Sequence, residues 1–516
     1  MASNNMKRFL LWILPFLMGG ILHAQDITVQ YKGNVAKVKQ QVKDSVSVTV
    51  DGAHVSIVST YQTYKLKVRL TGKSDDGQLI LKTDGKAKVK LDNLNLTSQE
   101  GAPLWLKNKK KVELVAVDGT QNTLTIAACN DTTNHKAAAI WSKDKVKFSG
   151  TGTLTVLATG DGCKGIRTKD DISIEELTLS VTTTGNNLGE DTTRMMGFGG
   201  PPPNFNPDDL PEEVKAHMEE MKKHFEEMQK NGEHPMMGGM RPEGNDSTRR
   251  GGFPPPAEGG FPAFNNNGEG GMPPGGGKHK YISTTKGIKS LGKITILSGN
   301  VTVKTSSPGA EGIEGKEGIE LNGGTVSVTA VDDAINANER IYFNGAHVTA
   351  ISTTNDAVDA NYGDGGGFPP FFGGQANNEQ KKAEPAIIIT DGTVYAWSQM
   401  GAPEEGLDCD FSPIEVSGGK VFSIGAGMGD MPSVPTNETA QQATALLIGL
   451  NVQKDEPILV FDSEGKQLES ITTPFSLQRS SSLISHPAFK VGKQYTVRTK
   501  GYEKTFTLTE NFTTIR

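Results

Sequence analysis

Two copies of one phrase decide the fold: Asp332-Asp333-Ala334-Ile335-Asn336-Ala337-Asn338 and Asn355-Asp356-Ala357-Val358-Asp359-Ala360-Asn361. Each opens a unit that continues with a gap, a β-rich run, a glycine and a second β-rich run. A unit repeated in this way indicates an architecture in which each repeat stacks on its neighbours. Looser copies contain Leu104, Ile140 and Ile166, and clear copies begin at Gly287, Gly312, Ala334, Ala357 and Gly406.

The spacing of the clear copies predicts the fold class. They lie 25, 22, 23 and 49 residues apart, and the last value falls to 26 when a Gly/Pro-rich insertion from Gly363 to Pro385 is set aside. Three short alternating strands in each unit, with no helical pattern between them, predict an all-β solenoid, the parallel β-helix. The missing helices exclude a doubly wound α/β fold. A β-propeller, whose blades need about 40 to 50 residues, is the second choice.

A break in composition divides the chain. Residues 191–278 hold 13 of the 26 prolines and 9 of the 15 methionines, and such a segment buries too little apolar surface to become ordered. We therefore predict a disordered Met/Gly/Pro-rich insertion with one short amphipathic helix that is available to a partner. The predicted organisation is a signal peptide over 1–24, N-terminal β-helix coils over 25–190, the low-complexity insertion over 191–278, C-terminal coils over 279–439 and a small β cap over 440–516.

The first residues predict export. Lys7 and Arg8 precede an apolar run from Phe9 to Leu22 that ends at Ala24, a pattern typical of a signal peptide. No later run is long and apolar enough to be a transmembrane segment. We expect an exported protein, in the periplasm, at the cell surface or outside the cell. The net charge of −6 argues against a nucleic-acid partner.

Side chains between the apolar residues of each unit are expected to point outward and to form ladders, with a step of about 4.8 Å between units. The first ladder consists of Trp105, Trp141, Arg167, Lys289, Glu314, Asn336, Asp359 and Asp408. The second consists of Lys107, Lys143, Lys169, Leu291, Lys316, Asn338, Asn361 and Asp410. A third set lies two residues before each apolar pair, at Glu311, Asp333, Asp356 and Glu405. The surface therefore changes from aromatic and basic to carboxylate and amide.

The acidic end predicts a calcium site. Stacked carboxylates one strand spacing apart repel one another unless a cation neutralises them. Carboxylate and amide oxygens without histidine or cysteine suit a hard cation, and in an exported protein that cation is most often calcium. The alternative is a solvated acidic face whose side chains only form turns. The candidate ligands are Glu311, Asp333, Asn336, Asn338, Asp356, Asp359, Asn361, Asp408 and Asp410.

The aromatic end predicts a carbohydrate site. Trp105 and Trp141 are neighbours in the first ladder, and an exposed indole usually binds something flat and apolar, such as the face of a sugar. Arg167 and Lys169 extend the strip with cations that pair with carboxylates. These four residues predict a site for a polysaccharide, including an anionic one. The alternative is that a loop covers the tryptophans and makes them packing residues.

The repeat phrases resemble a known family. Asp332 to Asn338, Asn355 to Asn361, Gly406-Leu407-Asp408-Cys409-Asp410 and the Gly323-Gly324-Thr325-Val326-Ser327-Val328 run are similar to those of secreted bacterial carbohydrate-binding-domain proteins with a right-handed, pectate-lyase-like parallel β-helix. The resemblance implies calcium bound by the acidic repeat residues. It also implies binding of plant cell-wall polysaccharides, such as cellulose or polygalacturonate, without established cleavage. The large insertion departs from a plain β-helix.

Two other functions compete with a calcium-dependent polysaccharide-binding protein. A calcium-dependent polysaccharide lyase would need a base near the acidic ladders, and Lys316 and Arg340 are the available candidates. Neither lies in a catalytic motif, so no catalytic residue is assigned. A surface adhesion or scaffold protein fits the solenoid equally well and differs only in its ligand.

Overall fold

The computed structural model describes residues 26–129, 137–190, 281–362, 384–409, 412–427 and 432–516. The chain divides into two compact units, residues 1–189 with 281–516 and residues 190–280. The predicted signal peptide and the amphipathic helix of the insertion lie outside the described residues. Throughout the described ranges the regular elements are strands, so they contain no helix that could cross a membrane.

One sheet contains eleven strands, all parallel except the first pair. Each later strand carries a buried aliphatic residue that alternates with an outward one, as in Leu104-Trp105-Leu106, and this period of two fixes which face is buried. The strands are, in sheet order, β3 (Val46–Asp51), β4 (His54–Ser59), β6 (Gln78–Thr83), β8 (Leu104–Asn108), β11 (Ala138–Ser142), β14 (Lys164–Thr168), β19 (Ile288–Ser290), β22 (Ile313–Gly315), β25 (Ile335–Ala337), β27 (Val358–Ala360) and β29 (Leu407–Asp408).

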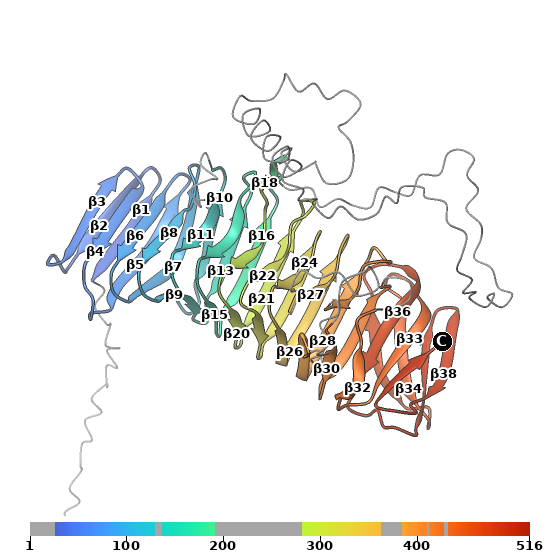
Figure 1. The fold of residues 1–516 in the computed structure, drawn as a ribbon. Coiled ribbons are helices and arrows are strands. Elements are labelled where there is room, and N and C mark those ends of the chain that lie inside the picture. The colour runs from blue at the N-terminus through green and yellow to red at the C-terminus, as the bar shows by residue number, and fades with distance from the viewer. Residues whose placement is uncertain (1–25, 130–136, 191–280, 363–383, 410–411, 428–431) are drawn as a thin grey trace, which may run out of the picture. The chain divides into compact units, whose positions relative to one another are not determined.

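A second sheet contains 22 strands and forms the other walls of the stack (Figure 1). Its first run consists of β1 (Ile27–Lys32), β2 (Val35–Gln40), β5 (Leu66–Ser74), β7 (Ala87–Ser98), β9 (Val112–Ala116), β12 (Val146–Ser149), β15 (Ile172–Ile174), β20 (Ile294–Ile296), β23 (Ile319–Leu321), β26 (Ile341–Ser352), β28 (Ile387–Ser398), β30 (Ile414–Val416) and β32 (Pro435–Ala440). Its second run consists of β10 (Gln121–Ile126), β13 (Thr153–Ala158), β16 (Thr178–Thr183), β21 (Asn300–Thr305), β24 (Thr325–Ala330), β31 (Lys420–Gly425), β33 (Thr444–Val452), β36 (Leu477–Ser485) and β39 (Phe512–Ile515). A separate two-stranded sheet pairs β17 (Leu188–Glu190) with β18 (Tyr281–Ser283).

The two runs are joined through long strands. β7 pairs in parallel with both β9 and β10, and β26 pairs in parallel with both β23 and β24. Between them, the pairings β9–β12–β15–β20–β23 and β10–β13–β16–β21–β24 complete a closed ring of twelve parallel strands. The predicted fold class, an open right-handed parallel β-helix solenoid, is therefore wrong, although the expected all-β content is present. The physical reason is that β7 and β26 each continue through two walls as one unbroken strand, whereas most other units have separate strands in the two walls.

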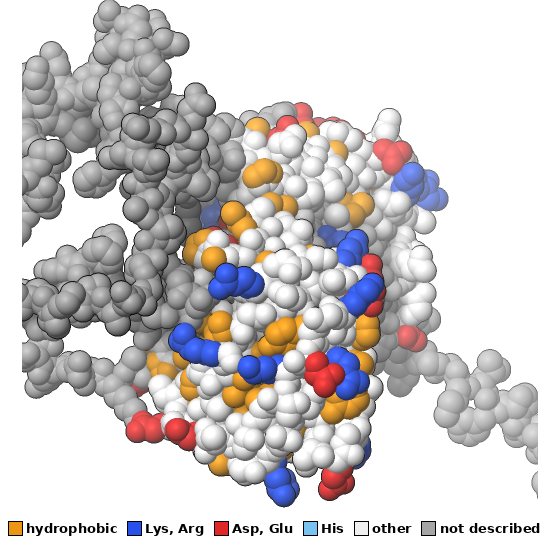
Figure 2. Space-filling model, turned by 90° about the vertical axis from the view of Figure 1, so that its right-hand side faces the viewer, with side chains coloured by type: hydrophobic (Ala, Val, Ile, Leu, Met, Phe, Trp, Pro, Cys, Tyr) orange, Lys and Arg blue, Asp and Glu red, His pale blue; other side chains and the backbone are white. Residues whose placement is uncertain are grey.

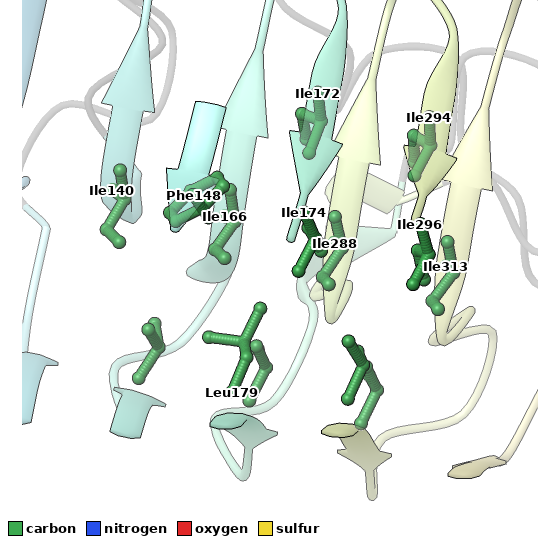
Figure 3. Close-up of a cluster of buried hydrophobic side chains, with 14 of the residues drawn as sticks. Ile140, Phe148, Ile166, Ile172, Ile174, Leu179, Ile288, Ile294, Ile296 and Ile313 are labelled. Carbon is green, nitrogen blue, oxygen red and sulfur yellow. The ribbon is translucent and has the colours of Figure 1, made fainter. Parts of the chain in front are cut away.

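The core is a stack of aliphatic ladders between these walls. Figure 3 shows Ile140, Ile166, Ile288 and Ile313 following one another on successive strands of the eleven-stranded sheet. Pairs such as Ile294 and Ile296 of the 22-stranded sheet lie across from them. All of these side chains are at most 2% exposed, and burial of this kind stabilises by about 25 cal/mol per Å² of apolar surface.

The residues after Ala440, predicted as a small β cap, contribute to two sheets. β36 pairs antiparallel with β31 and β33 and ends the parallel run, which covers an edge that would otherwise pair with another chain. A second apolar cluster, around Trp397, Val460 and Tyr495, forms the core of this region. On the face of the molecule drawn in Figure 2, basic, acidic and hydrophobic side chains are interspersed. The remaining strands form a four-stranded antiparallel sheet of β34 (Pro457–Asp462), β35 (Gln467–Thr472), β37 (Gln494–Thr499) and β38 (Tyr502–Thr507).

The alternation in β20 generates a stability prediction. Ile294→Ala removes a fully buried side chain and should lower the free energy of unfolding by about 2 to 5 kcal/mol, because it leaves a cavity. Thr295→Ala, one residue away on the outward side, should change it by less than about 1 kcal/mol. Chemical denaturation of both variants tests this. Equal losses would contradict the assigned inward and outward faces.

Candidate functional site

The first predicted ladder is confirmed by the strand register. Trp105 lies opposite Trp141, and Trp141 lies opposite Arg167. The ladder then continues through Lys289, Glu314, Asn336, Asp359 and Asp408. We call this row the mixed ladder.

The third set lies beside the mixed ladder. The amide nitrogens of Gly312, Ala334 and Ala357 donate to the carbonyl oxygens of the third-set residues of the next unit, at 2.9 to 3.3 Å. Lys164 and Lys286 occupy the equivalent positions in earlier units, since the nitrogen of Gly165 donates to the oxygen of Lys286 at 3.0 Å. Sequence reasoning missed both lysines because the third set was assigned only in the later units. The signal was available in the sequence, because Lys164 and Lys286 directly precede Gly165 and Gly287, just as Glu311 precedes Gly312.

The mixed ladder is less exposed than expected. Trp141, Glu314, Asn336 and Asp359 are all below a tenth exposed, whereas these positions were predicted to face solvent. Side chains of the third set contact them, as Asp333 contacts Asn336 through a hydrogen bond of 2.8 Å. The outward faces of these strands are therefore part of a second, polar layer rather than an open surface.

The aromatic end forms a small cluster. The rings of Trp105 and Trp141 meet edge to face, with centroids 6.2 Å apart at 85°, and Ala102 and Ala138 pack with Trp141. Lys107 places its Nζ 3.7 Å from the centroid of the Trp105 ring. Trp141 is 6% exposed, so it is a packed side chain in this structure and Trp105 is the more accessible of the two.

Cations gather next to the tryptophans. Trp141 Nε1 and Arg167 Nε are buried and have no hydrogen-bond partner. Burial, together with the charges of Arg167, Lys286 and Lys289, lowers the pKa of Lys164 to about 7. Lys169 follows β14 and is exposed. The centre of the ladder therefore contains buried donors and positive charge that an anionic or hydroxyl-bearing ligand would satisfy.

Glu314 anchors an ion network between the two ends. Its side chain is 2% exposed and accepts Lys286 at 2.9 Å, Lys289 at 2.7 Å and Lys316 at 2.5 Å. Burial alone would raise the pKa of Glu314, but the three lysines hold it well below its ordinary value. Glu311 lies 2.6 Å from Lys286, yet burial raises its pKa. Glu311, one of the candidate calcium ligands, is therefore paired with lysine.

The acidic end is linked by amides. Asn336 Nδ2 donates to Asp333 Oδ2 at 2.8 Å and to Asp359 Oδ2 at 2.9 Å. Asn361 Nδ2 also donates to Asp359 Oδ2, at 2.8 Å. Burial and the neighbouring carboxylates, Asp359 foremost, raise the pKa of Asp333 well above its usual range. These side chains, predicted to share a site, do lie together.

Asp356 and Asp408 continue this end. Burial and the charge of Asp408 raise the pKa of Asp356 to about 10, and its Oδ1 accepts the backbone N–H of Glu405 at 2.5 Å. Ser433 donates from Oγ to Asp408 Oδ1 at 3.0 Å. Asn338 is turned toward Lys316, whose Nζ donates to its side-chain oxygen at 2.9 Å.

The donor set fits calcium in kind. All candidate ligands offer oxygen, and Asp333 Oδ1 is buried without a hydrogen-bond partner, which a hard cation would satisfy. Within the described ranges, however, no three carboxylate, histidine or cysteine side chains are close enough to hold a metal ion. Asp410 lies outside the described residues. Calcium therefore remains a prediction at this end of the ladder.

Comparison with known proteins identifies the family. Residues 34–196 and 283–446, more than half of the chain, match the family of carbohydrate-binding domain-containing proteins. The chain belongs to this family.

Two individual proteins are also similar to this family member. A carbohydrate-binding domain-containing protein of Acetivibrio thermocellus is 32% identical over 131 residues, which are 24% of this chain and 45% of the relative. The chain thus spans less than half of that relative's length. A polysaccharide lyase-like protein from C. thermocellum, solved as a gadolinium derivative, is 18% identical in sequence, with a TM-score of 0.37. The matched region covers 63% of this chain and 90% of the chain of that protein.

The two lyase-base candidates of this carbohydrate-binding domain-containing protein are engaged elsewhere. Lys316 pairs with Glu314 and with Asn338. Arg340 pairs with Glu384, donates to the carbonyl oxygen of Pro385 at 3.0 Å and lies 4.0 Å from the centroid of the Tyr362 ring. Both side chains are therefore held as structural cations, and this arrangement does not favour proton abstraction by either.

Removal of the central carboxylate should destabilise the protein. Glu314→Gln leaves Lys289 and Lys316 without a carboxylate partner and Lys286 with Glu311 alone, so the free energy of unfolding should fall by about 3 to 5 kcal/mol. The control is Glu320→Gln, because Glu320 pairs with Lys293 at the surface and such pairs are worth about 1 kcal/mol or less. Urea denaturation measures both. A Glu314→Gln loss no greater than the control would show that the network does not stabilise the fold.

The raised pKa of Asp356 gives a pH dependence. Since its pKa is about 10 in the folded chain against an ordinary 3.8, the folded state binds the extra proton, and stability falls as pH rises between these values. In the presence of a calcium chelator, raising the pH from about 5 to about 7 should lower the free energy of unfolding of the wild type relative to that of Asp356→Asn. The relative loss should be at most about 1.4 kcal/mol per pH unit. Thermal denaturation of both proteins at each pH tests this. A difference that is constant with pH would contradict the buried, proton-binding Asp356.

Proposed function

We propose that this member of the carbohydrate-binding domain-containing family is an exported protein that binds acidic polysaccharides, such as the polygalacturonate of plant cell walls, along the mixed ladder. In this proposal, Trp105, Trp141, Arg167 and Lys169 contact the glycan, and the carboxylates at the other end hold calcium. The protein binds its glycan without cleaving it. Family membership supports a polysaccharide ligand, and the chemistry of the ladder supports an acidic one.

The observation that carries the proposal is the pair of unsatisfied donors. Trp141 Nε1 and Arg167 Nε come from side chains opposite each other on neighbouring strands, and both are buried without a partner. A buried donor without a partner costs about 1 to 3 kcal/mol. A uronate that displaces the side chains covering these two atoms would recover this cost, since its carboxylate accepts from the guanidinium and its hydroxyls accept from the indole. The adjacent Trp105 ring supplies an apolar face for the sugar.

The calcium part of the proposal rests on donor chemistry. Asp333, Asp356 and Asp359 are buried oxygen donors, and burial together with neighbouring carboxylates raises the pKa of Asp333 and of Asp356. Bound calcium would favour the ionised forms of Asp333 and Asp356. Asn336, Asn338 and Asn361 would contribute amide oxygens or orient the carboxylates.

A retention assay tests glycan binding. The purified protein, with and without calcium, should be retained by immobilised polygalacturonate, and Arg167→Gln should weaken retention about tenfold or more, equivalent to about 1.4 kcal/mol. Arg498→Gln, which alters an exposed pair with Glu503, is the control and should bind normally. Absorbance of unsaturated uronate is followed in the same samples. Equal binding by both variants would refute the assigned strip, and rising absorbance would establish a lyase instead.

Calorimetry tests the calcium site. Protein freed of metal by a chelator should take up calcium, and the double variant Asp333→Asn/Asp359→Asn should not, because it removes two ligands while keeping side-chain size. Asp391→Asn, an exposed aspartate of β28, is the control and should bind calcium like the wild type. No uptake by the wild type would leave the acidic end as a polar layer without a cation.

A further inference from the structure

A second face of the 22-stranded sheet has an unusual composition. On β10, β13, β16, β21, β24 and the second half of β26, three outward positions per strand make eighteen positions in all. Charged residues form 22% of the chain, which would place about four on this area, whereas Lys304 is the one charged residue there. Most of the other positions are threonine or serine. The strands lie side by side in the stack (Figure 1).

The middle positions form a continuous row of hydroxyls. Register pairs each of these residues directly with the next one along the stack. We call the row the hydroxyl column: Thr123, Thr155, Ser180, Thr302, Ser327 and Thr349. With about 4.8 Å between strands, the column is about 24 Å long. Thr125, Thr182 and Thr329 belong to a parallel row two residues further along the same strands.

These hydroxyls are available to a ligand. Each residue of the hydroxyl column is partly exposed, and within the described residues no side-chain hydrogen bond engages any of the six hydroxyls. Their backbone groups are already paired in the sheet, so the side chains alone carry the free donors and acceptors. The paired strands already hold these hydroxyls in a regular array, so binding of a ligand would cost little additional side-chain entropy.

Strand propensity alone does not account for the array. Threonine favours strands because of its branched side chain. The adjacent run of the same sheet has the same requirement, yet three of the five residues in its corresponding row are charged: Glu113, Lys147, Ser173, Thr295 and Glu320. The exclusion of charge is therefore a property of this one face rather than of the fold.

We infer that the hydroxyl column is a second glycan-binding face, which takes an uncharged polysaccharide of extended, flat form, such as an insoluble β-glucan. A neutral polymer offers hydroxyls in a regular row, and an uncharged array binds it without desolvating any charge. The same array gives no Coulomb attraction to a uronate, which distinguishes it from the mixed ladder. The inference draws on family membership for the ligand class but is independent of the acidic-glycan site.

Charge introduced on this face tests the inference. The full-length double variant Thr155→Lys/Thr302→Lys should bind microcrystalline cellulose at least about tenfold more weakly than the wild type, because two lysines must be desolvated at the contact. The matched control is Ser173→Lys/Thr295→Lys, at outward positions of β15 and β20 in the adjacent run. It should bind cellulose normally. Unfolding temperatures of both variants are measured to show that they fold, since surface changes usually cost less than about 0.5 kcal/mol.

The outcomes separate this face from the mixed ladder. Weakened cellulose binding with unchanged polygalacturonate retention in the face variant supports the inference, whether or not the acidic-glycan proposal holds. Absence of cellulose binding by the wild type, or equal loss in both double variants, overturns it. Sedimentation is followed as well. A wild-type dimer that the face variant dissociates would assign the face to a second copy of the chain and would also overturn the inference.

Discussion

The parallel, in-register pairing of neighbouring units is the constraint on which the rest of the structure depends. It places the same position of each unit next to its counterpart, so a single residue choice becomes a row along the stack. Inward, this produces the isoleucine ladders of the core. Outward, it produces rows whose chemistry is set by composition alone. The binding sites proposed for this protein therefore lie on rows of side chains rather than in a pocket formed by loops.

The mixed ladder shows how charge is managed along such a row. Like charges one strand apart are unfavourable, and the chain answers this differently at different points. Glu314 gathers three lysines in the middle of the ladder, and Asn336 separates and bridges Asp333 and Asp359. Burial and the neighbouring charges lower the pKa of Lys164 and raise the pKa of Asp356, so each side chain carries an electrostatic cost beside the ladder. That cost is what a bound glycan and a bound cation would relieve.

The sequence was sufficient to predict which residues share a row. The period of the repeat aligned Trp105, Trp141 and Arg167 correctly, since register follows from spacing. It was not sufficient to predict that β7 and β26 each continue through two walls and close the sheet, because whether a strand breaks between two walls depends on tertiary packing. The burial of Trp141 was also missed, since exposure depends on what the neighbouring third-set residues and Ala138 contact. Hydrogen bonds such as Asn336 to Asp359 required side-chain positions that no repeat pattern contains.

The most direct test of the account is a crystal structure of the protein soaked with calcium and an oligogalacturonate. The account predicts a uronate carboxylate within hydrogen-bond distance of Arg167 Nε, and a hydroxyl or carboxylate oxygen at Trp141 Nε1, the two donors that are unpaired now. Oligosaccharide bound elsewhere, with both donors still unpaired, would contradict the claim that the mixed ladder is the glycan-binding site.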